Sequence, residues 1–407
     1  MGRMGAILAA AAVLGTAIGI ARADQFFSVT ATNTAGTTTL TVGGRNIIDL
    51  TNHLINQEDQ FVALASQGFN AKLTYGGVPN AVVITENPQQ TQATVKFNTT
   101  GFSKTFTGSN SSDLQTQIQD FIKQDGLNQY AQFLISMNRL SLVASIDGNP
   151  LASTALIGDE AFNRFGLEPT LTEPVNDAHR TAPMPLDVVG GTSRAAGLNG
   201  NFGGVSFGGN IRFTDSVALD LITEVDYRSV SGSNIGTAAE IVGLPVTLLR
   251  RHADEDGLAW QLTPWGFGGI SASYDLAEGA ILIGGGGTSS LSYRWEDFTF
   301  TLADQIDYIG NEGVTVANYS FDVPVDQWLL KNGVQVLYQP NGGPLILDAG
   351  GAYSNFLHHG AVPNYWTPTA GAAFKLGRLT LIRAGFVGDF ARHFTECGGE
   401  VSLELRW

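Results

Sequence analysis

The sequence has little cysteine, little charge and no long apolar run after its N-terminus, and each deficit excludes a class of protein. The single cysteine among 407 residues, Cys397, has no partner for a disulfide within the chain, so stability must come from the fold itself. Charged residues make up 14%, against roughly 25% in ordinary soluble domains. No later segment reaches the roughly 18 uninterrupted apolar residues of a spanning helix, so a helical membrane protein is excluded.

Basic residues are also scarce, because 22 Lys and Arg stand against 37 Asp and Glu. An extended nucleic-acid footprint needs a basic face, so we expect no nucleic-acid partner. The length exceeds that of one ordinary soluble domain and favours a chain of two parts.

The first 23 residues have the pattern of a secretory signal. Arg3 precedes the apolar stretch GAILAAAAVLGTAIGI, and a small-x-small cleavage site follows at Ala21 to Ala23. An N-terminal membrane anchor is the alternative, but its apolar run would be shorter than the roughly 20 residues that a span needs. We therefore predict that residues 1–23 are a cleaved signal peptide.

The rest of the chain changes character near its middle. All six tryptophans lie at or after Trp260, and a proline-containing stretch, LEPTLTEPVNDAHRTAPMPLD, separates the two halves. This stretch has little periodicity and favours an extended linker. We predict a domain at residues 24–166, a linker at 167–198 and a second domain at 199–407.

Residues 24–166 have the pattern of a small α+β domain. Strands are predicted at FFSVTATN, TTTLTVGG, NAKLTYGG, AVVITEN, TQATVKFNTTG and FSKTFTG. Helices are predicted at RNIIDLTNHLINQEDQFVALA, where apolar residues recur at helical spacing, and at SSDLQTQIQDFIKQDGLNQYAQFLISM.

Residues 199–407 consist of short alternating segments. In VALDLITEVDYR, Leu221 and Val225 share one face while Asp220, Glu224 and Asp226 share the other. At roughly 10 residues per tilted strand, about 209 residues support about 12 strands. An even number closes the sheet without a free edge, so we predict an all-β antiparallel transmembrane barrel.

The two faces of these strands differ in chemistry. A membrane barrel carries apolar residues outside, with Trp and Tyr near its rims, and polar residues inside. The predicted membrane-interface aromatics lie near turns and are Tyr293, Trp295, Tyr338, Tyr365 and Trp366. The predicted lumen-facing charges are Asp220, Glu224, Asp226, Arg228, Lys375, Arg383, Glu404 and Arg406.

The final segment, GGEVSLELRW, alternates perfectly and ends on an aromatic residue. With the signal peptide and the short strands, it resembles the bacterial outer-membrane β-barrel proteins. The resemblance implies that Val401, Leu403, Leu405 and Trp407 form the insertion signal read by the barrel assembly machinery. It implies a location in the bacterial outer membrane and contact with its lipids. Because an even-stranded barrel has both ends on one side, we expect the N-terminal domain in the periplasm.

The expected function is a narrow porin-like channel or a structural element of the outer membrane. If the lumen is open, its charges would bias the passage of small polar solutes. One alternative is an autotransporter-type barrel that exports the N-terminal region, although no lumen-threading helix is evident just before Asn199. Another is a secreted all-β surface or binding protein, in which the alternating faces meet in a sandwich core.

Sequence motifs give no support for an enzyme. GVSFG at residues 204–208 matches G-x-S-x-G, but Ser206 lies in an alternating stretch without the helix that a nucleophile elbow requires. His358 and the neighbouring histidine at 359 would point apart on a strand, and His393 and Cys397 lack a third ligand at a known spacing. We predict no catalytic set, no metal site and no cofactor.

Overall fold

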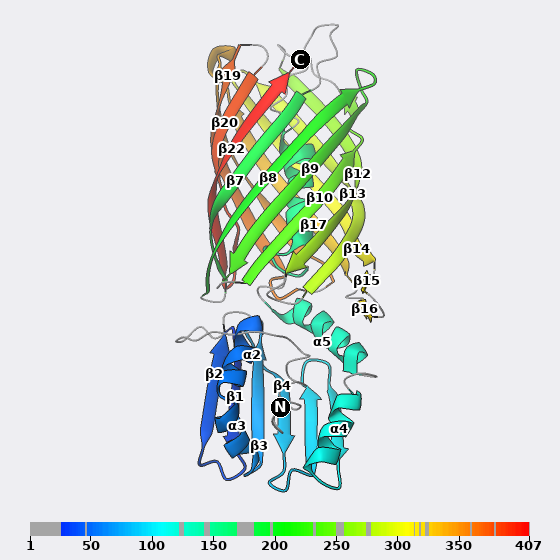
Figure 1. The fold of residues 1–407 in the computed structure, drawn as a ribbon. Coiled ribbons are helices and arrows are strands. Elements are labelled where there is room, and N and C mark those ends of the chain that lie inside the picture. The colour runs from blue at the N-terminus through cyan, green and yellow to red at the C-terminus, as the bar shows by residue number, and fades with distance from the viewer. Residues whose placement is uncertain are drawn as a thin grey trace.

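The computed structural model of the protein describes residues 26–44, 47–121, 126–141, 147–168, 183–195, 198–230, 233–249, 256–273, 278–312, 314–316, 319–321, 325–358, 360–377 and 380–406. The predicted signal peptide lies outside these residues. Figure 1 shows two parts, an α+β domain and a barrel, with the α+β domain beyond one mouth of the barrel and the C-terminus at the other.

The α+β domain contains a six-stranded antiparallel sheet in the order β2-β1-β3-β4-β5-β6. The strands are β1 (Phe27–Asn33), β2 (Thr39–Gly44), β3 (Phe69–Tyr75), β4 (Val78–Glu86), β5 (Gln92–Phe97) and β6 (Phe102–Thr107). The helices are α2 (Ile47–Asn56), α3 (Glu58–Ala65), α4 (Ser111–Phe121) and α5 (Leu127–Leu140). The strands alternate between buried and exposed residues, because only one face of the sheet is covered.

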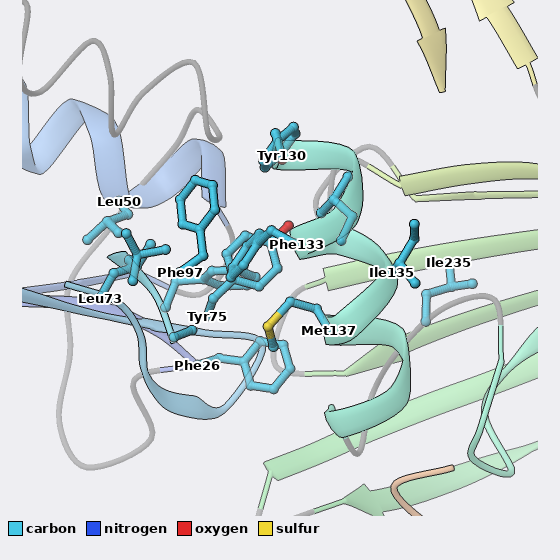
Figure 2. Packing of buried hydrophobic residues seen from close by; sticks show 14 of the residues in the cluster. Phe26, Leu50, Leu73, Tyr75, Phe97, Tyr130, Phe133, Ile135, Met137 and Ile235 are labelled. Atoms are coloured by element: carbon cyan, nitrogen blue, oxygen red, sulfur yellow. The ribbon is translucent and has the colours of Figure 1, made fainter. Parts of the chain in front are cut away.

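Aromatic rings fill the core of this domain. Tyr75 packs edge-on against Phe27 and Phe133, with ring centroids 4.9 and 5.1 Å apart. Figure 2 shows Phe133 of α5 turned towards the sheet, while Ile135 of the same helix lies towards Ile235 of the barrel. Helix α5 therefore joins the core of the α+β domain to the barrel mouth.

Within the described residues, twelve antiparallel strands close into the predicted barrel. Each strand pairs with its neighbours in the chain, and β7 pairs with β22 to complete the ring. They are β7 (Pro183–Ala195), β8 (Leu198–Arg212), β9 (Ala218–Val230), β10 (Ser233–Gly243), β12 (Gly257–Ser273), β13 (Glu278–Trp295), β14 (Phe298–Glu312), β17 (Asp326–Tyr338), β18 (Leu345–Phe356), β19 (Asn364–Leu376), β20 (Thr380–Val387) and β22 (Phe394–Arg406).

Shorter elements connect or flank these strands. They are β11 (Val246–Leu249), β15 (Val314–Val316), β16 (Tyr319–Phe321), β21 (Phe390–Ala391) and the 3-10 turn η4 (Pro340–Gly342). No helix in the described part of the chain has the length and apolar character to cross a membrane.

The outer face of the barrel carries an apolar band between two sets of aromatic pairs. On β14 and β17, Phe298 stacks on Tyr338 and, ten residues away, Tyr308 packs on Trp328, with ring centroids 4.8 and 5.2 Å apart. At about 3.3 Å per residue and a tilt of about 40°, ten residues span about 25 Å along the barrel axis. This height matches the apolar band of an outer-membrane barrel.

A helical segment runs through the barrel (Figure 1, the teal helix inside it). It consists of α6 (Ser153–Phe162) and the π-helical turn η2 (Asn163–Leu167). Ser153 hydrogen-bonds Thr237 near the start of β10, whereas Phe165 lies against Gly243 at the end of that strand. The segment therefore runs parallel to β10, from the mouth near the α+β domain towards the opposite mouth.

The structure corrects the predicted boundaries of the barrel and the linker. The barrel begins with β7 at Pro183, inside the stretch predicted as linker, and not at 199. Pro183 and Pro185 made this stretch look unlike a strand, because proline cannot donate a ladder hydrogen bond. Residues 183–185 pair only with β22 and have no partner on β8. A proline there leaves no ladder bond unmade on the β8 side. Residues 153–166, predicted as part of the α+β domain, lie in the barrel lumen.

Candidate functional site in the barrel lumen

Half of the residues of helix α6 are Ser, Thr, Ala or Gly, which fit inside a narrow barrel. Its sequence, STALIGDEAF, is buried at every position except Asp159 and Glu160. Gly158 and Gly333 lie at close contacts, because a Cβ at Gly158 would sit 2.7 Å from Leu329 and one at Gly333 would sit 2.8 Å from Phe162. The helix and the wall therefore touch over surfaces that leave no room for larger side chains.

Hydroxyl groups hold the first turn of α6. The Ser153 hydroxyl hydrogen-bonds Thr237 at 2.6 Å and Ser271 at 2.7 Å, on β10 and β12. Thr154 donates to Asp147 at 3.1 Å, just before the helix. These buried hydroxyl and carboxylate groups therefore have hydrogen-bond partners within the protein and do not require water.

An ion pair anchors the middle of the segment. The Lys331 ammonium on β17 pairs with Asp159 on α6, and the Tyr365 hydroxyl donates to the same carboxylate at 3.0 Å. The ammonium also lies 5.6 Å from the Phe162 ring centroid and 5.4 Å from that of Tyr365. Lys331 is 2% exposed, so this pair is an internal tie between helix and wall.

The end of the segment is tied in the same way. Arg164 pairs with Asp220 of β9 and with Glu168, both at 3.2 Å. The Ser290 hydroxyl donates to the Gly166 carbonyl at 2.6 Å, and Gln305 donates to the Gly158 carbonyl at 2.9 Å. The barrel wall thus donates hydrogen bonds to two backbone carbonyls of the segment, one in its middle and one near its end.

A small acidic cavity remains beside the segment. It measures about 150 Å³ and lies between α6 and strands β7, β8, β9, β19, β20 and β22. Its acidic lining residues are Asp159, Glu160, Glu168, Asp187, Glu224, Asp226, Asp389, Glu396 and Glu400, and its basic ones are Arg228 and Arg383. The cavity therefore has a strong excess of negative charge.

The two arginines do not neutralise this charge completely. Arg228 makes a two-pronged contact with Glu396 at 2.6 and 2.7 Å, and Arg383 pairs with Asp348 at 2.8 Å. Within the described chain, Glu224 Oε2 and Asp226 Oδ2 are buried without a hydrogen-bond partner. Both unpaired oxygens belong to β9, so this side of the cavity has acceptors that the protein leaves unsatisfied.

The structure places most of the proposed lumen charges along this inner wall. Asp220, Glu224, Asp226, Arg228, Arg383 and Glu404 are buried, and Lys375 is half-buried on the same face of β19 as Thr367 and Thr369. Four of them, Glu224, Asp226, Arg228 and Arg383, line the acidic cavity together. The acids that pair with the two arginines, Glu396, Asp348 and Glu400, were not among the predicted residues. The Arg406 side chain lies outside the described residues.

The proposed interface aromatics divide between the two faces. Tyr293, Trp295 and Trp366 are 49%, 54% and 59% exposed on the outer face, and Tyr338 stacks on Phe298 there. Tyr365 is the exception and corrects the prediction, because it is fully buried in the lumen against Asp159. Adjacent strand residues point to opposite faces, so Tyr365 and Trp366 cannot both face lipid.

The residues of the proposed insertion signal lie on the outer face of β22. Val401 is 54% exposed, and Leu403 and Leu405 are half-buried on the same face. Trp407 lies outside the described residues. Recognition of this strand by an assembly factor stays a prediction.

The segment that occupies the lumen was missed in the sequence. Its signal is weak, because a helix enclosed on all sides has no amphipathic stripe. The stretch of small residues from Ala152 to Ala161 and the isolated Lys331 within a strand pattern are the two features that indicate it. Among the described residues no group of three or more His, Cys, Asp or Glu is arranged to hold a metal ion, and Ser206 lies on β8 beside Asp187 at 3.4 Å, without a histidine.

The closed ring, the apolar outer band and the polar lumen define a membrane-spanning β-barrel. The twelve antiparallel strands and the aromatic pairs at both rims make it a barrel of the bacterial outer-membrane type. A small α+β domain precedes this barrel in the chain.

Comparison with known proteins finds similar barrels among solved structures. The translocator domain of autotransporter NalP from Neisseria meningitidis matches 63% of this chain and 98% of its own length, with 14% identity and a TM-score of 0.42. An outer membrane channel from Pseudomonas putida F1 matches 58% of this chain and all of its own length, with 11% identity and a TM-score of 0.40. No protein-family description and no curated protein matches the chain.

Proposed function

We propose that this protein is an autotransporter-type barrel, which carries its α+β domain on the outer side of the membrane through a polypeptide segment in the lumen. One observation carries the proposal. The segment α6–η2 starts at the mouth beside the α+β domain and runs towards the mouth where β7 begins and β22 ends.

The direction of the segment supports a position of the α+β domain outside the cell. Pro183 of β7 lies opposite Arg406 of β22, so both ends of the barrel chain lie at one mouth. A barrel assembled from the periplasm keeps these ends on the periplasmic side. The α+β domain, at the other mouth (Figure 1), would then be outside the cell, and not in the periplasm as the even number of strands led us to expect.

The contacts of the segment also favour an autotransporter with a chain threaded through its lumen, rather than an open channel. Ser153, Asp159 and Arg164 each bond to the wall through their side chains, at the start, middle and end of the segment. The acidic cavity beside the helix measures about 150 Å³, which is too small to hold a sugar-sized solute.

The test is the accessibility of two epitope tags in intact cells. One tag is inserted at Gly101, in the turn between β5 and β6 of the α+β domain, and the other at Gly342, in the turn between β17 and β18 at the opposite mouth. We expect antibody to label the first tag on intact cells and the second only after the outer membrane is opened. The reverse pattern would overturn the proposal and favour a periplasmic domain.

A narrow cation-selective channel is the second candidate, and the acidic cavity favours it. If the segment leaves the lumen, the wall residues Glu224, Asp226 and Glu396 would line a water-filled path and attract cations. Deletion of residues 153–167 should convert a barrel with little conductance into one with a steady, cation-selective conductance in planar bilayers. High conductance in the intact protein would favour the channel as the main function.

A further inference from the structure

A polar pair interrupts the apolar outer band of the barrel. Asp304 of β14 and Asn332 of β17 lie opposite each other in register and are exposed on the outer face. Asp304 lies between Leu302 and Ile306, each 47% exposed. The pair is four residues from the Tyr308–Trp328 aromatic pair and six from the Phe298–Tyr338 pair, so it lies well inside the hydrocarbon layer.

These two side chains lack partners within the protein. Among the described residues, the side chains of Asp304 and Asn332 have no hydrogen bond and no ion pair. A second outer-face carboxylate, Glu240, differs because it accepts a hydrogen bond from Thr223 at 2.7 Å. Polar groups that face hydrocarbon without a partner are costly, so the Asp304–Asn332 pair calls for a partner outside the chain.

A shallow, open depression surrounds the pair. A depression of about 630 Å³ includes Asp304 and Asn332. Its apolar lining includes Leu262, Pro264, Ile306 and Leu330. It is also lined by Gly287, where a Cβ would meet nothing within 4 Å. Small residues at such a place allow another backbone to approach closely.

We propose that this patch, defined as Asp304, Asn332 and the surrounding depression, is the interface through which two copies of this chain associate in the membrane. The patch holds both an acceptor and a donor. A two-fold axis through it would place the Asn332 amide of each copy against the Asp304 carboxylate of the other. Lipid acyl chains offer no donor to Asp304, so a second copy satisfies groups that lipid leaves exposed.

Crosslinking in native membranes tests the proposal. The background is Cys397→Ser, so that the only thiol is the one introduced. Ile306→Cys places it in the patch, and Val225→Cys, on an outer-face position of β9 that is 51% exposed, is the matched control. With a short bifunctional maleimide we expect an adduct of twice the mass of the chain from Ile306→Cys and little from Val225→Cys.

Substitutions then test whether the Asp304–Asn332 pair makes the contact between the two copies. In the Ile306→Cys background, Asp304→Leu with Asn332→Leu should lower the adduct yield about tenfold, since the lost bonds occur twice across the axis. Glu240→Leu, which removes a lipid-facing carboxylate elsewhere, should leave the yield unchanged. Each variant is first shown to be folded by its faster migration on a gel without boiling.

Three results would overturn the proposal. They are equal crosslinking at positions 306 and 225, an adduct whose mass is not twice that of the chain, and an unchanged yield in the folded double-leucine variant. The second of these would indicate a different membrane protein on the patch.

Discussion

Lys331 on the barrel wall and Asp159 on the lumen helix form a buried ion pair between residues that are far apart in the sequence. The rings of Phe162 and Tyr365 flank the ammonium, so water has little access to it. Such a pair contributes to position more than to stability, because its two charges lost their hydration on burial. Its role is to fix how far α6 extends into the barrel.

Lys331→Met should therefore loosen the lumen helix. Removal of one partner of a buried pair costs about 3–5 kcal/mol at most, because Asp159 would stay inside the lumen without a cation and is only 18% exposed there. We expect faster amide hydrogen exchange in α6 and a lower temperature for loss of the fast-migrating gel band. The double variant Lys331→Met with Asp159→Leu should recover most of the protection of α6 from exchange. Equal exchange in the unaltered protein and both variants would show that the ion pair does not hold the helix.

Gly333→Val should prevent α6 from seating. A Cβ at this position would lie 2.8 Å from the Phe162 ring, and the larger side chain would push the helix away from β17. We expect frequent channel openings in planar bilayers, where the unaltered protein is nearly closed. Gly268→Ala is the control, because nothing lies within 4 Å of a Cβ there; the same conductance in both variants would exclude a packing effect.

Leu221→Arg should block insertion into the membrane. Leu221 is 42% exposed on the outer face of β9, and an arginine in the apolar band costs about 2–4 kcal/mol. Cell fractionation and gel migration without boiling should show little folded barrel, whereas Leu221→Val should insert normally. Normal assembly of the arginine variant would show that the assignment of faces is wrong.

The α+β domain should lose stability as the pH rises towards neutrality. Glu86 of β4 is 6% exposed, and burial raises the pKa of its carboxyl from 4.5 to about 7. The folded state therefore holds the proton more tightly than the unfolded state, so its stability is full below pH 4.5 and is lost as the pH rises to about 7.

The measurement for Glu86 is hydrogen exchange of the β4 and β5 amides in the full chain, between pH 4 and pH 8, corrected for the intrinsic pH dependence of exchange. A shift of this size corresponds to about 3 kcal/mol. Glu86→Gln should remove the dependence between these pH values. A slope that persists in the glutamine variant would assign it to another group.

Much of the fold could be predicted from the sequence because its signals are local. In β14, alternate residues such as Leu302 and Ile306 face lipid while Ala303 and Gln305 face the lumen, and this period is visible in any single strand. The predicted number of about twelve strands and the small α+β domain are confirmed for the same reason.

The occupied lumen could not be predicted because its determinants are distant from one another. Ser153 bonds to Ser271, and Asp159 bonds to Lys331 and Tyr365, residues more than a hundred positions away along the chain. The pattern of residues within 153–167 contains no information about partners so far away in the sequence. Tyr365 lies near a turn, as interface aromatics do, but it is adjacent to Trp366 on the strand and therefore faces the opposite side of the sheet.

The close contacts between helix and wall have a consequence for the evolution of this protein. Gly158 meets Leu329, Gly166 meets Ala303 and Gly333 meets Phe162, so each contact has a fixed combined volume. A lineage that enlarges one member can keep the helix in place only if it shrinks the other. Homologous sequences should therefore show compensating changes in size at these three pairs, linking the segment in the lumen to strands that follow it by more than a hundred residues.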